Sequence, residues 1–151
     1  VMEVANSEGV ELEETAARAI ADVSLGDLRK AITSLQVAAS LDSHVTRDLV
    51  YETTATAPPE ELHGFFLACK EDGFQPARRR MREILDRFGL AGTDLVNQLH
   101  RELGKVTFLD EPQKLKVTEA MAECDFRMVE GGGESLQLDA MAARICSMLG
   151  N

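Results

Sequence analysis

Residues 58–73 read PPEELHGFFLACKEDG and contain the local signals of a complete helix, from its start to its end. Proline is favoured in the first turn of a helix, and the two glutamates that follow complement the positive end of the helix dipole. Asp72-Gly73 ends the pattern. The apolar side chains between these signals recur at helical spacing, namely Leu62, Phe65, Phe66 and Cys69. The stretch therefore predicts a helix from about Pro59 to Glu71.

The same signals recur on both sides of this stretch and predict a series of short helices. Before it, we expect helices over about 2–7, 12–23 and 28–39, and a short one capped by either Ser43 or Thr46. After it, prolines, glycines and capping residues predict helices over about 76–88, 93–106, 111–129 and 136–149. One apolar face of the third helix is traced by Leu28, Ala31, Ile32, Leu35, Ala38 and Ala39. Strand-like alternation is absent over any useful length, so the sequence predicts an all-α protein.

Composition narrows the class of protein. The chain has 151 residues, is 44% hydrophobic and lacks tryptophan, so aliphatic side chains must do most of the packing. Its formal net charge of −10 argues against a nucleic-acid surface, which usually shows a basic patch. The three cysteines, Cys69, Cys124 and Cys146, form no Cys-x-x-Cys pair. This favours reduced thiols and an intracellular protein.

Neither a membrane span nor a signal peptide is predicted. No apolar run approaches the ~20 residues that cross a bilayer. The N-terminus lacks the basic and apolar regions of a signal peptide. The chain begins directly inside a helical pattern, which is typical of a piece of a longer protein.

No complete catalytic or metal site is predicted. The phosphate-binding pattern Gly-x-x-x-x-Gly-Lys-Ser/Thr is absent, and the triple glycine at 131–133 is better explained as a turn. His44, His63 and His100 have no second histidine or cysteine at metal-ligand spacing. Cys69 with His63 suggests a nucleophile and base, but Cys69 lies on an apolar helix face, where a buried thiol is inert.

One helix carries a basic cluster, Arg78-Arg79-Arg80 with Arg82 and Arg87. The possible basic surface is formed by Arg78, Arg79 and Arg82, which could contact phosphate. The cluster also lies opposite the apolar stripe of its helix, where solvated charges belong. A solvated face or an ion-pairing protein interface is therefore favoured over nucleic-acid binding.

A second motif, Gly26-Asp27-Leu28-Arg29-Lys30-Ala31, combines a glycine break, an acidic cap and an arginine in the first helical turn. Arginine suits phosphate because its guanidinium is forked and permanently charged. The motif could aim Arg29 at an anion held by a neighbouring domain. From the residues alone, however, an ordinary surface arginine near a helix start is the default interpretation.

At this motif the chain resembles the small subunits of replication factor C, the archaeal and eukaryotic sliding-clamp loader. The resemblance covers nearly the whole chain, and its order and spacing are more specific than any single motif. The matching stretches are residues 8–12, 26–32, 35–36, 96–102, 125–131 and 136–138.

The resemblance implies an AAA+ ATPase subunit of archaeal type whose nucleotide-binding domain lies outside this chain. Residues 1–41 would be the end of the helical lid, and residues 42–151 a helical-bundle collar that holds the subunits in an oligomeric ring. Arg29 matches the second-sensor arginine, which reaches ATP phosphates in the same subunit. ATP and Mg would serve the full-length protein, and this chain alone would be no enzyme and bind neither. The partners would be sister subunits, with the clamp and primer-template DNA met through the complex. No membrane is implied. The protein would be located in the cytoplasm, associated with the nucleoid, or in the nucleus of a eukaryote.

Two other hypotheses stay open at this point. A free-standing helical module could bind nucleic acid or protein, using the arginines between Arg78 and Arg87. A small helical enzyme is the third hypothesis, and no local motif supports it.

Overall fold

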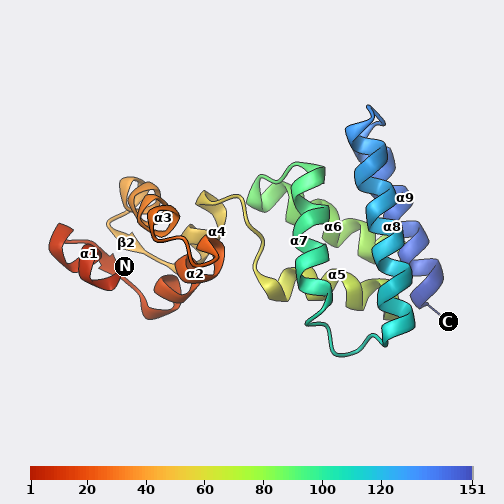
Figure 1. Cartoon of the computed structure of the whole chain (residues 1–151), viewed down its shortest axis with the longest axis horizontal. Coiled ribbons are helices and arrows are strands. Elements are labelled where there is room, and N and C mark those ends of the chain that lie inside the picture. The colour runs from red at the N-terminus through yellow and green to blue at the C-terminus, as the bar shows by residue number, and fades with distance from the viewer. Residues whose placement is uncertain (151) are drawn as a thin grey trace. The chain divides into compact units, whose positions relative to one another are not determined.

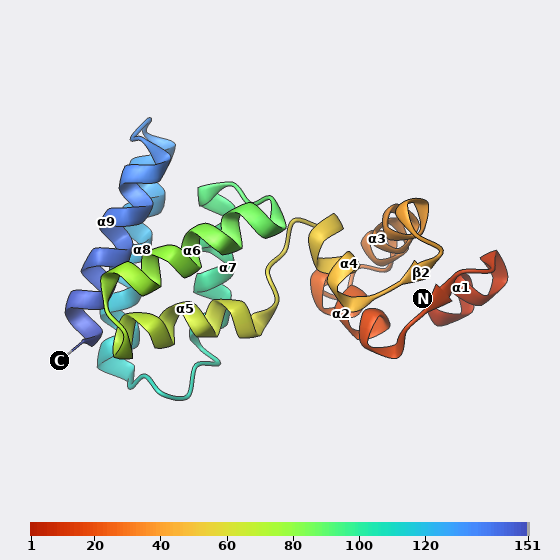
Figure 2. The same cartoon turned by 180° about the vertical axis from the view of Figure 1, so that it is seen from behind.

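The structure, a computed structural model, describes residues 1–150, and within that range it contains nine helices and two very short strands. The predicted all-α fold is confirmed. The chain divides after Thr56 into two compact units, and each is described by itself. Figures 1 and 2 show the elements from opposite sides.

The first unit holds four helices and a small sheet. Its elements, in chain order, are α1 (Met2–Glu8), β1 (Glu11–Leu12), α2 (Glu14–Ser24), α3 (Leu28–Leu41), β2 (His44–Val45) and α4 (Arg47–Thr53). Two helix starts are capped as the sequence predicts. The Asp27 carboxylate accepts the Lys30 N–H at 3.1 Å, and the Thr46 hydroxyl accepts the Leu49 N–H at 3.3 Å.

Small side chains let the helices of the first unit pack closely. α2, α3 and α4 pack against one another, and α1 packs against β1. β1 pairs in parallel with β2, with Glu11 opposite His44 and Leu12 opposite Val45. The core is rich in alanine and comprises Ala5, Ala16, Ala19, Ile20, Val23, Ala31, Leu35, Ala38, Val45, Val50 and Tyr51.

Three details of the first unit differ from the prediction. The helix expected from Leu12 begins at Glu14, because Leu12 pairs in β1. Leu28 is 66% exposed and does not belong to the apolar face of its helix. It is the first residue of α3, and that first turn is directed outward. The first unit also extends past the predicted boundary at residue 42, since β2 pairs with β1 and α4 packs against α2. The assignment of residues 1–41 and 42–151 to two domains stays a prediction.

The second unit is a bundle of five helices. They are α5 (Pro59–Glu71), α6 (Phe74–Phe88), α7 (Gly92–Leu103), α8 (Glu111–Val129) and α9 (Glu134–Leu149). The predicted bounds of α5 and α8 are confirmed, whereas α6 and α9 each begin two residues earlier than predicted. At the start of α8, Asp110 and Gln113 cap each other's backbone N–H groups, a full capping box.

α5 lies at the centre of this bundle. α6, α7 and α9 all pack against it, and α8 completes the bundle by packing against α7 and α9. The largest side chains buried in this unit are Leu62, Phe65, Phe66, Met81, Ile84, Leu95, Leu99, Met121, Leu138 and Ile145. Among the described helices, none is both long and apolar enough to cross a membrane.

A buried amide holds the segment that leads into α5. The side-chain oxygen of Gln98 on α7, only 6% exposed, accepts the Ala57 backbone N–H at 2.8 Å. Prolines at 58 and 59 have no N–H, so Ala57 carries the last backbone donor before the helix begins. This bond therefore fixes the approach of the chain to α5.

Candidate functional site

Arg29 lies at the exposed start of α3, where two left-handed residues turn the chain. Leu25 has φ 51° and Gly26 has φ 84°, and the Asp27 side chain then caps the helix. Arg29 is the second residue of α3, and its guanidinium pairs with no side chain of residues 1–150. The local geometry thus presents a cation beside the positive end of a helix dipole, an arrangement that suits an anion. The predicted phosphate-sensing role of Arg29 stays a prediction.

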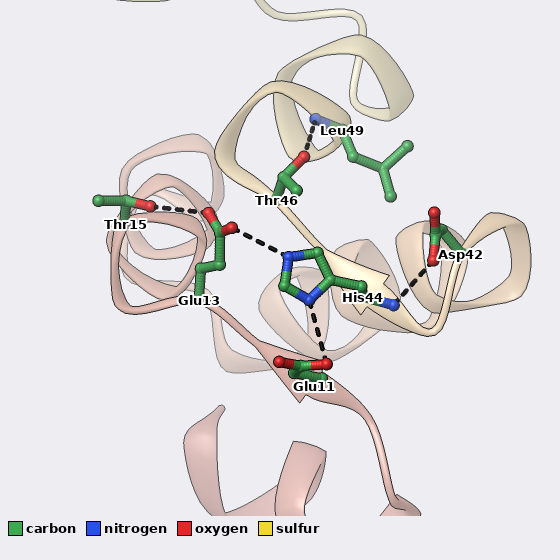
Figure 3. Close-up of polar contacts among 7 residues, drawn as sticks. All are labelled: Glu11, Glu13, Thr15, Asp42, His44, Thr46 and Leu49. Atoms are coloured by element: carbon green, nitrogen blue, oxygen red, sulfur yellow. Dashed lines mark hydrogen bonds and ion pairs between the residues drawn. The ribbon is translucent and has the colours of Figure 1, made fainter.

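The sheet of the first unit is clasped by a histidine between two carboxylates (Figure 3). His44 Nδ1 lies 3.2 Å from a Glu11 oxygen, and its Nε2 lies 3.0 Å from a Glu13 oxygen. Glu11 and Glu13 are two residues apart in extended chain, so their side chains point to the same face. The backbone N–H of His44 also donates a hydrogen bond to the Asp42 carboxylate at 2.9 Å. The clasp thus joins the segments before and after α2 and α3.

This geometry favours the doubly protonated imidazole. Both ring nitrogens face acceptors, and only the imidazolium can donate from both at once. The hydrogen bonds to Glu11 and then to Glu13 raise the pKa of His44 above its ordinary value, against a small opposing effect of burial. The sequence did not reveal this cluster, because strands of two residues are too short to show a pattern.

We expect the clasp to be measurable as a histidine titration. In NMR spectra of the whole chain, His44 should titrate above pH 6.5, and Glu11→Gln or Glu13→Gln should each lower its pKa. Because the folded-state pKa is raised, the clasp stabilises the first unit below about pH 6.5 and is lost as pH rises through the folded-state pKa. Glu14→Gln is the matched control, since Glu14 pairs with Arg18 instead. An unchanged His44 pKa in both clasp variants would contradict this account.

The basic cluster of α6 is largely paired within the second unit. Arg78 Nε lies 3.0 Å from one Asp139 oxygen, and Arg82 Nη2 lies 2.8 Å from the other. Arg82 also donates to the Ser135 hydroxyl at 2.7 Å. Burial raises the pKa of Asp139, but the hydrogen bonds from Arg82 and Arg78 outweigh it and hold that pKa below its usual value. Two of the three predicted surface arginines therefore join α6 to α9.

The other arginines of the cluster differ in their surroundings. Arg80 lies 3.8 Å from a Glu61 carboxylate, and a Cβ added at Gly64 would collide with its guanidinium. Arg87 lies over the Phe88 ring, 5.1 Å from its centroid. Arg79, the third arginine of the predicted basic surface, is exposed, and no side chain of the described residues forms an ion pair with it. The predicted basic surface of Arg78, Arg79 and Arg82 stays a prediction, but these contacts do not form a continuous cationic patch.

Removing the charge of Asp139 should weaken the second unit. We expect Asp139→Asn to lower the free energy of unfolding by about 1–2 kcal/mol, since both arginines lose a charge-assisted partner at a partly exposed site. The loss should be seen by urea unfolding followed with circular dichroism at neutral pH. It should shrink as pH falls through the lowered folded-state pKa of Asp139, because the wild type then loses the same charge.

The matched control for this charge removal is Asp86→Asn, which changes an exposed carboxylate on α6. It should alter stability by less than about 0.5 kcal/mol. Equal stability of the Asp139→Asn variant and the wild type at neutral pH would show that the α6–α9 pairing contributes nothing.

The remaining candidate residues are engaged in local pairs. His63 Nε2 on α5 lies 2.9 Å from a carboxylate oxygen of Glu102 on α7. This contact engages the ring nitrogen that a base for Cys69 would use. Cys69 is fully buried, as predicted, and lies beside the same pocket as Cys146 of α9. His100 is exposed. Within residues 1–150, no group of three or more His, Cys, Asp or Glu side chains is arranged so that it could hold a metal ion.

Comparisons with known proteins identify both units. Residues 1–40 match the model of the RCF1/5-like AAA+ ATPase lid domain, and residues 57–144 match that of the replication factor C C-terminal domain. The chain therefore belongs to the replication factor C family, as the sequence resemblance predicted.

Individual archaeal proteins agree with these models. The replication factor C small subunit of Methanopyrus kandleri is 39% identical over 148 residues, which are 98% of this chain and 23% of that protein. The small subunit of Methanocella arvoryzae is 34% identical over 95% of this chain and 44% of its own length. That of Archaeoglobus fulgidus is 35% identical over 98% of this chain and 46% of its own length. The chain thus spans less than half the length of each of these relatives.

Proposed function

We propose that this chain forms the end of the lid and the collar of a clamp-loader small subunit. The observation that carries the proposal is the match of residues 57–144 to the C-terminal domain of replication factor C. In this role the collar holds sister subunits, small and large, in a ring that loads the sliding clamp onto primed DNA. The chain supplies a scaffold, and chemistry resides in the nucleotide-binding domains of the full-length subunits.

The proposed domain limits are residues 1–41 for the lid and 42–151 for the collar. The match of residues 1–40 to a lid model supports the first limit. The compact first unit reaches Thr56, so residues 42–56 would connect the lid to the collar while packing with the lid helices.

Exposed apolar side chains near the turn between α8 and α9 support a role in association. Phe126 and Val129, on the last turns of α8, are 64% and 69% exposed, and Leu136 on α9 is 69% exposed. Burying an apolar side chain against another protein stabilises the complex by roughly 1.5–3 kcal/mol per residue. These three residues are therefore our candidates for a subunit contact.

The remaining assignments follow from the same proposal. ATP and Mg would be bound by the full-length subunit, which would hydrolyse ATP, while this chain alone would bind neither and catalyse nothing. Contacts with the clamp and with primer-template DNA would be made through the complex, in the cytoplasm or, in a eukaryote, the nucleus. The alternative of a free-standing nucleic-acid-binding module is not favoured, since the chain belongs to this family and Arg78 and Arg82 are paired with Asp139.

Association of the isolated chain is the direct test. We expect sedimentation velocity to show concentration-dependent self-association, or complex formation with a sister loader subunit. Replacing Phe126, Val129 and Leu136 with glutamate should weaken this association at least about tenfold, since each change places a charge where apolar contact is needed.

The control is Leu41→Glu, which adds the same charge at a side chain of the first unit that is 69% exposed. It should leave association unchanged. The collar assignment would be refuted if the chain stayed monomeric at every concentration and formed no complex with a sister subunit.

Arg29 is proposed to contact the phosphates of ATP in the full-length subunit. Two features beside it support this orientation toward another domain. Leu25 and Leu28 are 70% and 66% exposed, and neighbouring exposed apolar side chains can mark a surface that contacts another protein or domain. Leu25 also adopts a left-handed φ of 51°, a conformation that costs energy for a residue with a branched side chain. Contact with a nucleotide-binding domain would offset both.

In a full-length subunit, Arg29→Ala should weaken ATP binding or slow hydrolysis by about tenfold or more, the usual effect of losing a charge-assisted phosphate contact. Lys30→Ala is the matched control, because Lys30 adjoins Arg29 on the same exposed helical turn. ATP affinity and steady-state turnover measure the effect. Equal losses in the two variants would point to general electrostatics and against a specific role for Arg29.

A further inference from the structure

Two of the three cysteines meet where α5 and α9 pack together. Cys69 lies near the end of α5 and Cys146 near the end of α9, and the two ends lie side by side in both views (Figure 2). Cys69 is completely buried and Cys146 is 8% exposed. The two residues are close neighbours, because the carbonyl oxygens of both lie within 4 Å of a Cβ placed on Gly150. Cys124, by contrast, donates to the Gln137 carbonyl at 3.3 Å and stands apart from this pair.

The pair also borders a surface pocket. Both cysteines line it, and the loop between α5 and α6 and the last residues of α9 complete its wall. Other lining residues include Lys70, Asp72, Phe74, Ser147 and Gly150. Of the two cysteines only Cys146 keeps exposed surface, so a small molecule in this pocket would meet Cys146 first.

A hydrogen bond between the two thiols would make their pKa values unequal. It raises the pKa of Cys69 far above the ordinary value, and burial adds to this effect. The same bond lowers the pKa of Cys146, against the opposing effect of burial. The thiolate is the reactive form of cysteine, and Cys146 is also the more exposed of the two residues. Cys146 is therefore better placed to attack, with Cys69 as its neighbour.

We propose that Cys69 and Cys146 form a redox-active dithiol, which a small-molecule disulfide oxidises to an intramolecular disulfide between α5 and α9. The Cys146 thiolate attacks one sulfur of the small disulfide, whose S–S bond breaks and releases one small thiolate. Cys69 then loses its proton, attacks the Cys146 sulfur and displaces the second small thiol. The two protein thiols lose two electrons and two protons in all, and the small disulfide becomes two thiols.

Oxidation would fasten two helices that are remote in sequence. A crosslink that closes a long loop restricts the unfolded chain and so stabilises the folded state. It would also hold the last turn of α9 against α5 and tighten the pocket. This inference concerns the bundle itself and stands whether or not the chain acts as a collar.

The test uses the whole reduced chain. It is incubated with oxidised glutathione, its free thiols are alkylated, and the products are analysed by mass spectrometry. We expect an intact mass lower by two hydrogens, alkylation at Cys124 alone, and a digest fragment that links Cys69 to Cys146. The thermal midpoint should rise by roughly 10 °C or more and return to its starting value after reduction with dithiothreitol.

Three variants separate the steps. Cys124→Ser, the matched control, should form the same crosslink. Cys69→Ser should stop at a glutathione adduct on Cys146, and Cys146→Ser should form neither adduct nor crosslink. The proposal is overturned if the oxidised wild type keeps all thiols free, retains a stable glutathione adduct, forms dimers through disulfides, or crosslinks through Cys124. The wild-type result decides this even if a variant fails to fold.

Discussion

Burial of Phe65 and Phe66 on α5 is the constraint on which the second unit depends. Both rings are fully buried, with centroids 5.6 Å apart. Adjacent helical residues point in directions about 100° apart, so one helix face cannot cover both rings. α6, α7 and α9 must therefore enclose α5 from several sides. The ends and edges of these helices then set the positions of the Arg78–Arg82–Asp139 pairing and of the two cysteines.

The first unit obeys a different constraint, the close approach that small side chains allow. Alanines at positions 16, 19, 31 and 38 are buried where α2, α3 and α4 meet. Tyr51 is the buried aromatic side chain among the described residues of this unit. Local polar contacts therefore do more to fix the conformation of its turns and short strands. The His44 clasp and the left-handed turn at Leu25-Gly26 are two of these, and the turn sets the direction of Arg29.

The distribution of charged side chains suits contacts with protein better than contacts with nucleic acid. The chain carries 26 acidic and 16 basic residues, and the densest arginine cluster is used to join α6 to α9 and to pair with Glu61. Near the α8–α9 turn, the second unit leaves large apolar side chains exposed among charged ones. For a member of the replication factor C family, this combination supports a scaffold that associates through its helices.

The sequence by itself determined the helices and the family. Capping residues, prolines and apolar spacing act within one or two turns, so the bounds of α5 and the start of α8 at Asp110 could be predicted from neighbouring residues alone. Only the tertiary structure decided which side chains meet. His44 with Glu11 and Glu13, Asp139 with Arg78 and Arg82, and Cys69 with Cys146 are each far apart along the chain. Their meeting depends on how whole helices pack, which no local pattern encodes.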